Sequence, residues 1–172
     1  LAADLRSIEY ASSAIVVTGH RLDDIADPLN AFGLVIPAVE KRKILAVSFT
    51  SRKFPNRAPD GCAQLRTFVG GAMQPELLDL DADQLLEMVR GELSELLGVR
   101  GKPQVARIAR YHRAMPQYHV GHLDRVARIE TAAAALPFLE LAGNAYHGVG
   151  IPDCVHSGEQ AAERVFSQLC SA

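Results

Sequence analysis

The chain has few of the residues that mark a disulfide-stabilised or nucleic-acid-binding protein. Its 172 residues include three cysteines, Cys62, Cys154 and Cys170, which lie far apart and form no C-x-x-C pair. Such a pattern argues against a disulfide framework and favours a reducing cytoplasm. The formal net charge is -2, and no basic stripe is interleaved with aromatic residues. We therefore expect no nucleic-acid partner.

Long apolar runs are also missing. None approaches the roughly 20 residues that a membrane-spanning helix requires, and the start of the chain carries no signal-peptide pattern. Because the chain begins at Leu1 rather than at a methionine, we interpret it as a piece of a longer protein. Apolar residues make up 48% of it, which is enough to form a sizeable core in one domain or two small ones.

Short runs rich in β-branched and alternating apolar residues predict strands in the first part of the chain. The predicted strands cover residues 8–18, 32–39, 44–50 and 65–70. Residues 19–24 and 55–61 carry the Gly, Asp, Pro and Asn typical of turns and loops. Consecutive strands with short connections indicate an antiparallel meander.

Helical periodicity follows. Leucines at helical spacing predict a helix that Asp81 and Gln84 cap at its start and Gly98 ends. A strand is expected over residues 103–111, a helix over 122–136, a short strand over 138–142 and a last helix over 152–169.

The last helix has an apolar stripe that includes Ala161, Val165 and Leu169, with Ala162 and Phe166 beside it. From the 3.6-residue period we predict that Ala162 and Val165 are buried, and that Glu159 and Arg164 are exposed. Gly158 lies inside this helix, where glycine costs about 1 kcal/mol relative to alanine. A close approach to a strand or a cofactor would explain it.

Three closely spaced glycines, Gly143, Gly148 and Gly150, follow the short strand, and Pro152 opens the last helix. Glycines let a ligand approach the backbone. Unpaired N–H groups and the helix dipole favour negative charge at this end of the helix. The pattern predicts an anion-binding turn, although spacing alone also fits a plain strand-to-helix connection.

Two other clusters are weaker. His112, His119 and His122 lie close in sequence, but without a C-x-x-C pair or a third ligand at typical spacing we expect no metal site. A basic loop at residues 52–57 could pair with carboxylates or simply be solvated.

Two runs resemble a known family. MPQYHVGH (residues 115–122) and LAGNAYHGVGIPDCVHSG (141–158) are similar to the C-terminal part of protoporphyrinogen and coproporphyrinogen oxidases, FAD enzymes of haem synthesis in the flavin amine-oxidase superfamily. IEYASSAIV, FGLVIP and SRKFPNRAPDG resemble the strands and a loop of the family's substrate domain. The resemblance therefore covers nearly the whole chain.

This resemblance implies an α+β fold with an antiparallel or mixed sheet and flanking helices. Residues 1–121 would belong to the substrate-binding domain, and residues 122–172 would be the C-terminal strand–helix piece of a Rossmann-like FAD-binding domain. The flavin would contact Val149, Gly150 and Ile151 through their backbone, with Gly143 and Asn144 near it and Gly148 setting the turn. Tyr111 stands where the family commonly has a tryptophan near the flavin.

The implied enzyme removes six hydrogens from a porphyrinogen, and its reduced flavin passes electrons to oxygen. No catalytic side chain can be assigned within this chain. The G-x-G-x-x-G motif that holds the pyrophosphate in such folds is absent. We therefore expect this chain alone to be inactive, and to need an N-terminal half as its partner.

Other interpretations stay open. The parent could oxidise an amine or a carotenoid, or the chain could be a tetrapyrrole-binding module without redox chemistry. The sequence also leaves open whether the substrate is protoporphyrinogen or coproporphyrinogen, and which molecule accepts the electrons. We expect a cytoplasmic protein, and whether it docks peripherally on a membrane is open as well. We expect the isolated chain to self-associate, most simply as a symmetric dimer.

Overall fold

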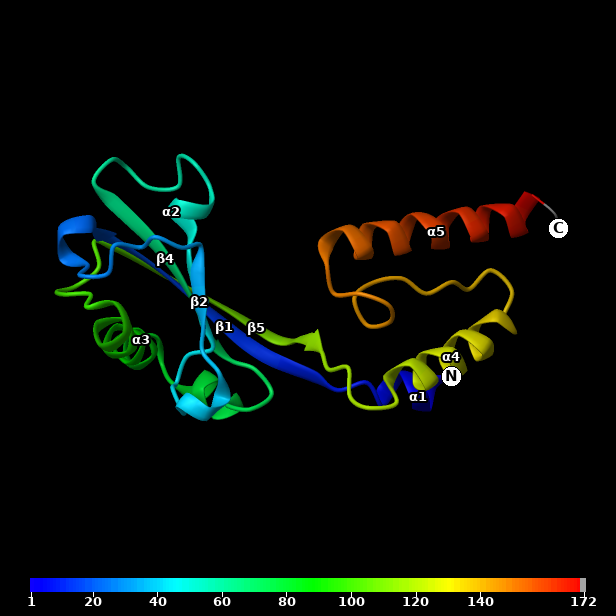
Figure 1. Cartoon of the computed structure of the whole chain (residues 1–172). Helices are drawn as coiled ribbons and strands as arrows, with labels where there is room; N and C mark the ends of the chain where they lie inside the picture. Colours follow the sequence, from blue (N-terminus) through cyan, green and yellow to red (C-terminus); the bar gives the residue numbers. More distant parts are fainter. Residues whose placement is uncertain (171–172) are drawn as a thin grey trace. The chain divides into compact units, whose positions relative to one another are not determined.

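The computed structural model describes residues 1–170 and divides them into two compact units (Figure 1). The β-sheet unit is Ala11–Met115, and the helical unit combines Leu1–Tyr10 with the chain from Pro116 onward. The predicted α+β class is confirmed. The division differs from the single boundary expected near Gly121, because the first helix packs against a helix of the later segment.

The β-sheet unit is built on one five-stranded sheet, with strand order β2-β3-β4-β1-β5. The strands are β1 (Tyr10–Arg21), β2 (Gly33–Val35), β3 (Ala46–Phe49), β4 (Cys62–Gly70) and β5 (Val105–Pro116). Shorter helices connect them: η1 (Leu22–Asp24), η2 (Ala38–Glu40), α2 (Thr50–Lys53) and η3 (Pro75–Asp79). The predicted meander is confirmed for β2, β3 and β4, whereas β1 lies between β4 and β5.

β1 is longer than the sequence indicates. It continues through the expected turn at Gly19 and His20, because these residues pair with Gln64 and Ala63 of β4. The ladder therefore overrides the local turn signal. β2, in contrast, contains only three of the residues expected in its strand.

The helix α3 (Ala82–Leu97) covers one face of this sheet, and its ends are as predicted. The Asp81 carboxylate accepts a hydrogen bond from the Gln84 backbone N–H at 2.8 Å, and the Gln84 side chain accepts one from the Asp81 N–H at 3.1 Å. Gly98 ends the helix with a φ of 62°. The buried residues of α3 are Leu85, Val89, Leu93 and Leu97.

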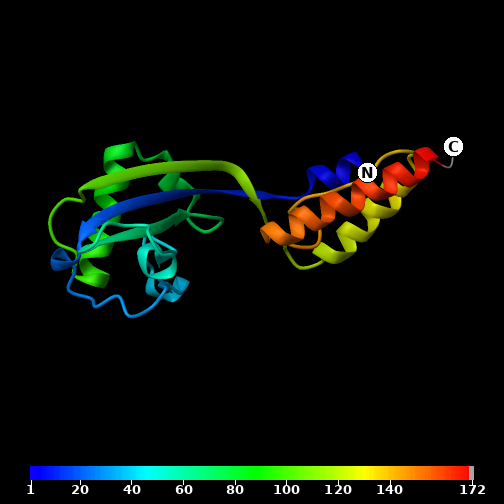
Figure 2. The ribbon, with the colours of Figure 1, turned by 90° about the horizontal axis from the view of Figure 1, so that it is seen from above.

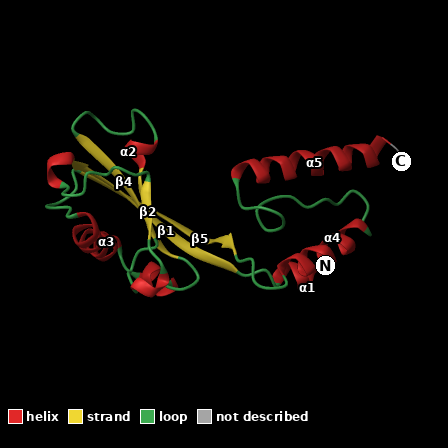
Figure 3. Ribbon diagram, in the orientation of Figure 1, coloured by secondary structure: helices red, strands yellow, loops and turns green. Residues whose placement is uncertain are grey.

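The helical unit contains α1 (Ala2–Arg6), α4 (His122–Ala134) and α5 (Ile151–Cys170), which Figure 2 shows from above and Figure 3 in red. Its small core consists of Ile8, Ile129 and Ala145, against which Leu1 and Leu5 pack. Among the described residues, no helix combines the length and apolar character needed to cross a bilayer.

Two predictions for this unit are wrong. Residues 139–142 form no strand, because a strand needs a ladder partner and the described residues offer none here. On α5, Ala161 is buried, but Ala162 is exposed and Val165 is only half-buried. Phe166 is 68% exposed. The apolar stripe is real, but no layer within the unit covers it.

The exposure of Glu159 and Arg164 is confirmed. Glu159 faces solvent, whereas the half-exposed Arg164 side chain pairs with Glu140 of the same unit.

The buried His20 makes the stability of the β-sheet unit depend on pH. Burial lowers the pKa of His20, which Arg90 also lowers and Asp24 raises. The unfolded chain takes up a proton near pH 6.5, whereas the folded chain resists it. The contribution of the neutral, buried His20 to the free energy of unfolding should therefore be fully present above about pH 6.5 and should be lost as the pH falls below it.

We expect His20→Leu to flatten this dependence, measured by urea unfolding at about pH 8 and about pH 5. His112→Gln, at an exposed histidine of β5, is the matched control and should lose as much free energy of unfolding at acidic pH as the parent chain does. An equal decrease in the free energy of unfolding at acidic pH in His20→Leu and in the parent chain would show that His20 is not the cause of the pH dependence.

Candidate functional site

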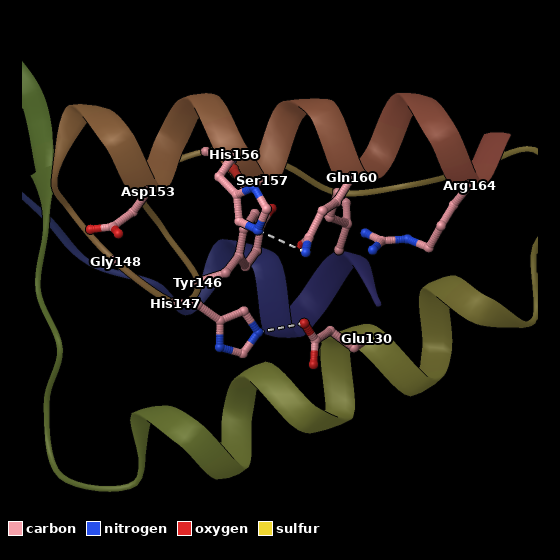
Figure 4. Close-up of a pocket in the computed structure, with 11 residues that line it drawn as sticks. Glu130, Tyr146, His147, Gly148, Asp153, His156, Ser157, Gln160 and Arg164 are labelled. Carbon is pink, nitrogen blue, oxygen red and sulfur yellow. Dashed lines mark hydrogen bonds and ion pairs between the residues drawn. The ribbon is translucent and has the colours of Figure 1, made fainter. Parts of the chain in front are cut away.

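The glycine turn (residues 143–150) lies against a cavity of about 310 Å³ in the helical unit (Figure 4). α4, the turn and α5 all contribute to its lining. The polar residues of the lining include Glu130, His147, Asp153, His156, Ser157, Gln160 and Arg164. The cavity therefore combines carboxylates, imidazoles and one guanidinium beside the side-chain-free backbone of Gly143 and Gly148.

Ser157 connects the start of the turn to the helix that follows it. The Gly143 N–H donates to Ser157 Oγ at 3.0 Å, and the Ser157 hydroxyl donates to the Cys154 carbonyl oxygen at 2.8 Å. Gly143 has a φ of +115°, a conformation that favours glycine. The backbone therefore enters the turn at a fixed point on α5.

The other two glycines make room for a carboxylate of the chain itself. A Cβ atom on Gly148 or Gly150 would lie 2.7 Å from Asp153 Oδ2. Asp153 stands in the first turn of α5, where a negative charge complements the helix dipole. An external anion at Gly148 or Gly150 would meet this carboxylate, so the geometry here does not favour a free anion, and the anion-binding turn stays a prediction. The turn is better suited to a neutral, flat ligand edge that hydrogen-bonds to backbone.

The structure brings six of the seven predicted cofactor residues together in or beside the turn: Gly143, Asn144, Gly148, Val149, Gly150 and Ile151. Val149 is 54% exposed and Ile151 is 81% exposed, so their apolar side chains are open to a ligand. Tyr111 lies in the β-sheet unit, on β5, and is 46% exposed.

Two side-chain contacts at the cavity have no counterpart in the sequence patterns. His147 Nε2 lies 2.6 Å from Glu130 Oε1 (Figure 4), and Arg164 Nε donates to Glu140 at 2.7 Å. The partners are 17 and 24 residues apart in sequence. No local spacing rule connects residues at such separations.

The histidines singled out from the sequence have other partners. His119 Nε2 lies 3.1 Å from a carboxylate oxygen of Glu9, and His122 Nε2 contacts the Tyr146 carbonyl oxygen at 3.0 Å. Within residues 1–170, no group of three His, Cys, Asp or Glu side chains could hold a metal ion.

The basic loop is exposed and pairs with an aromatic ring of its own. Lys53 Nζ and the Arg57 guanidinium lie 5.5 and 5.8 Å from the centre of the Phe54 ring. Arg52 donates to the Pro28 carbonyl oxygen at 3.4 Å. These contacts fit a solvated loop.

Comparisons with known proteins cover almost the whole chain. The family model of flavin containing amine oxidoreductases matches residues 4–166. Coproporphyrinogen III oxidase of Bacillus subtilis is 32% identical over 97% of this chain, and that of Propionibacterium freudenreichii is 36% identical over 98%. The mitochondrial protoporphyrinogen oxidase of Nicotiana tabacum is 32% identical over 94%. The chain spans about a third of the length of these relatives (36%, 32% and 33%).

Solved structures agree with this result. One assigned as a protoporphyrinogen oxidase from Exiguobacterium sp. 255-15 superposes with a TM-score of 0.79 at 30% identity, over 97% of this chain and 36% of that chain. Reduced UDP-galactopyranose mutase superposes with a TM-score of 0.71 at 18% identity, over 99% of this chain and 36% of that chain. The second likeness shows a shared fold.

Gly158 gives a direct test of how crowded α5 is. Beyond the backbone of α5 itself, no described atom lies within 4 Å of a Cβ built there, so no strand of the described residues makes the close approach that the sequence predicts. We expect Gly158→Ala to raise the free energy of unfolding by about 1 kcal/mol in urea denaturation, because alanine favours helix. Gly91→Ala in α3, equally open, should give a similar gain. A loss in Gly158→Ala beside a gain in Gly91→Ala would show that something packs on Gly158.

Proposed function

Because the chain belongs to the family of flavin-containing amine oxidoreductases, we propose that it is part of an FAD-dependent porphyrinogen oxidase of haem synthesis. The parent would convert a porphyrinogen to a porphyrin by a six-electron oxidation, with oxygen as the acceptor. The observation that carries this proposal is the glycine turn, within a chain matched almost end to end by enzymes named coproporphyrinogen III and protoporphyrinogen oxidase.

The residues of the turn fit a flavin better than they fit a phosphate. Gly148 and Gly150 have no side chain, and Val149 and Ile151 present exposed apolar groups on either side of Gly150. A planar ring could lie on such a surface, with its polar edge on the backbone. The Asp153 carboxylate disfavours the pyrophosphate at this point. The flavin, when bound, supplies the redox chemistry, and the protein supplies its orientation.

The two units suit two roles. We assign the β-sheet unit to the substrate domain and the helical unit to the returning part of the FAD domain. In this interpretation the exposed stripe of α5 packs on the part of the FAD domain that carries the G-x-G-x-x-G turn. Whether protoporphyrinogen or coproporphyrinogen is the substrate depends on the substrate pocket of the whole enzyme.

A chimera tests the proposal. This chain would replace the matched segment of the Bacillus subtilis coproporphyrinogen III oxidase, and porphyrin fluorescence would report turnover. We expect the chimera to retain FAD and to oxidise coproporphyrinogen, and we expect the isolated chain with added FAD to stay at the autoxidation rate. Heat-sensitive turnover by the isolated chain would contradict the role assigned to the absent segment, and a folded chimera without flavin would contradict the proposed function.

Within the chimera, Gly150→Glu should lower FAD affinity at least about tenfold. The new side chain would fill the ligand's space and place a second carboxylate beside Asp153. The flavin-to-protein absorbance ratio measures this effect. Gly91→Glu, on an open helix position, should leave the ratio unchanged. A normal ratio in folded Gly150→Glu would remove Gly150 from the site.

Exposed apolar side chains of the helical unit predict self-association of the isolated chain. Phe166 and Leu169 are 68% and 59% exposed, next to one another on α5. We expect a dimer by light scattering coupled to size exclusion, weakened by Phe166→Glu and unaffected by Val39→Glu, at an exposed position of the β-sheet unit. A monodisperse monomer at ~0.1 mM would contradict this prediction.

A further inference from the structure

Tyr118 and His122 stack face to face within the helical unit. Their ring centroids are 3.8 Å apart and their planes are inclined by 13°. His122 is the first residue of α4 and is 5% exposed, while Gly121 before it has a φ of 82°. This left-handed step turns the chain sharply between the two rings, and glycine adopts it without strain. The MPQYHVGH run therefore builds a fixed aromatic pair.

The polar ends of both rings reach the glycine turn. The Tyr118 hydroxyl donates to the Asn144 carbonyl oxygen at 2.7 Å and accepts a hydrogen bond from the Gly148 backbone. His122 Nε2 contacts the Tyr146 carbonyl oxygen at 3.0 Å. A carbonyl only accepts, so Nε2 carries the proton. Two side chains thus bind three backbone groups of the turn.

The surroundings keep these donors in the required state. Partial burial raises the pKa of the Tyr118 hydroxyl and is the largest influence on it; the Gly148 hydrogen bond lowers the pKa, and Cys154 and Asp153 raise it further. The phenol therefore remains a donor at neutral pH. His122 Nδ1 is buried without a hydrogen-bond partner among the described residues, which leaves the Nε2 contact as the polar anchor of this ring.

The turn lacks the regular backbone hydrogen bonds of a helix or a strand, so side-chain contacts to its backbone matter for its conformation. Residues 143–150 contain no helix or strand, and residues 139–142 before them pair with no strand in the described chain. Backbone without a ladder or helix opens readily. An unfixed turn would have to be ordered by its ligand, which lowers affinity.

We propose that Tyr118 and His122, the aromatic clamp, are positioning residues that hold the glycine turn in its ligand-binding conformation before any ligand arrives. The clamp itself is a property of this chain alone. Its importance for flavin binding rests on the proposed function. The inference explains why the two runs that resemble the family occur together, since one supplies the turn and the other holds it.

Hydrogen exchange measured by mass spectrometry on the full 172-residue chain tests the clamp. Tyr118→Phe removes only the hydroxyl, and His122→Phe keeps a flat ring but removes the donor. Each should speed exchange of amides 144–148 by about tenfold, while α3 amides keep their rates. His119→Gln, whose partner is Glu9, is the control and should leave the turn unchanged. Unaltered exchange in Tyr118→Phe, an isosteric change that should fold, would overturn the proposal.

A second measurement separates the clamp from the proposed function. In the chimera, Tyr118→Phe should raise the FAD dissociation constant about tenfold while the free energy of unfolding of the flavin-free protein changes little. Faster exchange in the isolated chain with unchanged FAD affinity in the chimera would support the clamp and contradict the flavin role of the turn.

Discussion

The stack of Tyr118 on His122 is the contact on which the candidate site depends. The hydrogen bonds of its two rings join the start of α4 to the turn before α5, two segments that are separated by more than twenty residues of sequence. The helical unit has only a small apolar core around Ile8, Ile129 and Ala145. Burial of Ala145 fixes one point of the turn in this core, and the hydrogen bonds of Tyr118 and His122 to the turn backbone add directional contacts.

The Asp153 carboxylate changes the chemistry expected at the glycines. Glycine-rich turns at helix N-termini commonly bind phosphate. Here the Asp153 carboxylate already lies over Gly148 and Gly150. A carboxylate in the first helical turn stabilises α5 through the dipole, and it also directs anionic groups elsewhere. The carboxylate at this turn supports the proposal that the flavin phosphates bind a segment carrying the G-x-G-x-x-G motif.

The sequence predicts those features that depend on near neighbours. The capping box of α3 and its glycine end are correct because each involves residues within a few positions. Strand positions were also predicted, although β1 continues past Gly19 because of pairing with β4. The strand at 138–142 and the burial of Ala162 were wrong, since both need a layer that the described chain does not supply.

For the site, the sequence and the family resemblance identified the glycine turn and its flanking residues, which the structure brings together. They did not reveal the clamp or the pair of His147 with Glu130. Both depend on contacts over 17 to 26 residues, which no helical or strand period encodes.

The central claim is that the clamped turn receives the flavin through its backbone. The most direct measurement is an experimental structure of the FAD-loaded chimera. The account predicts the flavin ring within hydrogen-bonding distance, about 3 Å, of backbone N–H groups in residues 149–151, with both contacts of the clamp retained. A flavin bound elsewhere, or a turn that releases Tyr118 and His122 when FAD binds, would contradict it.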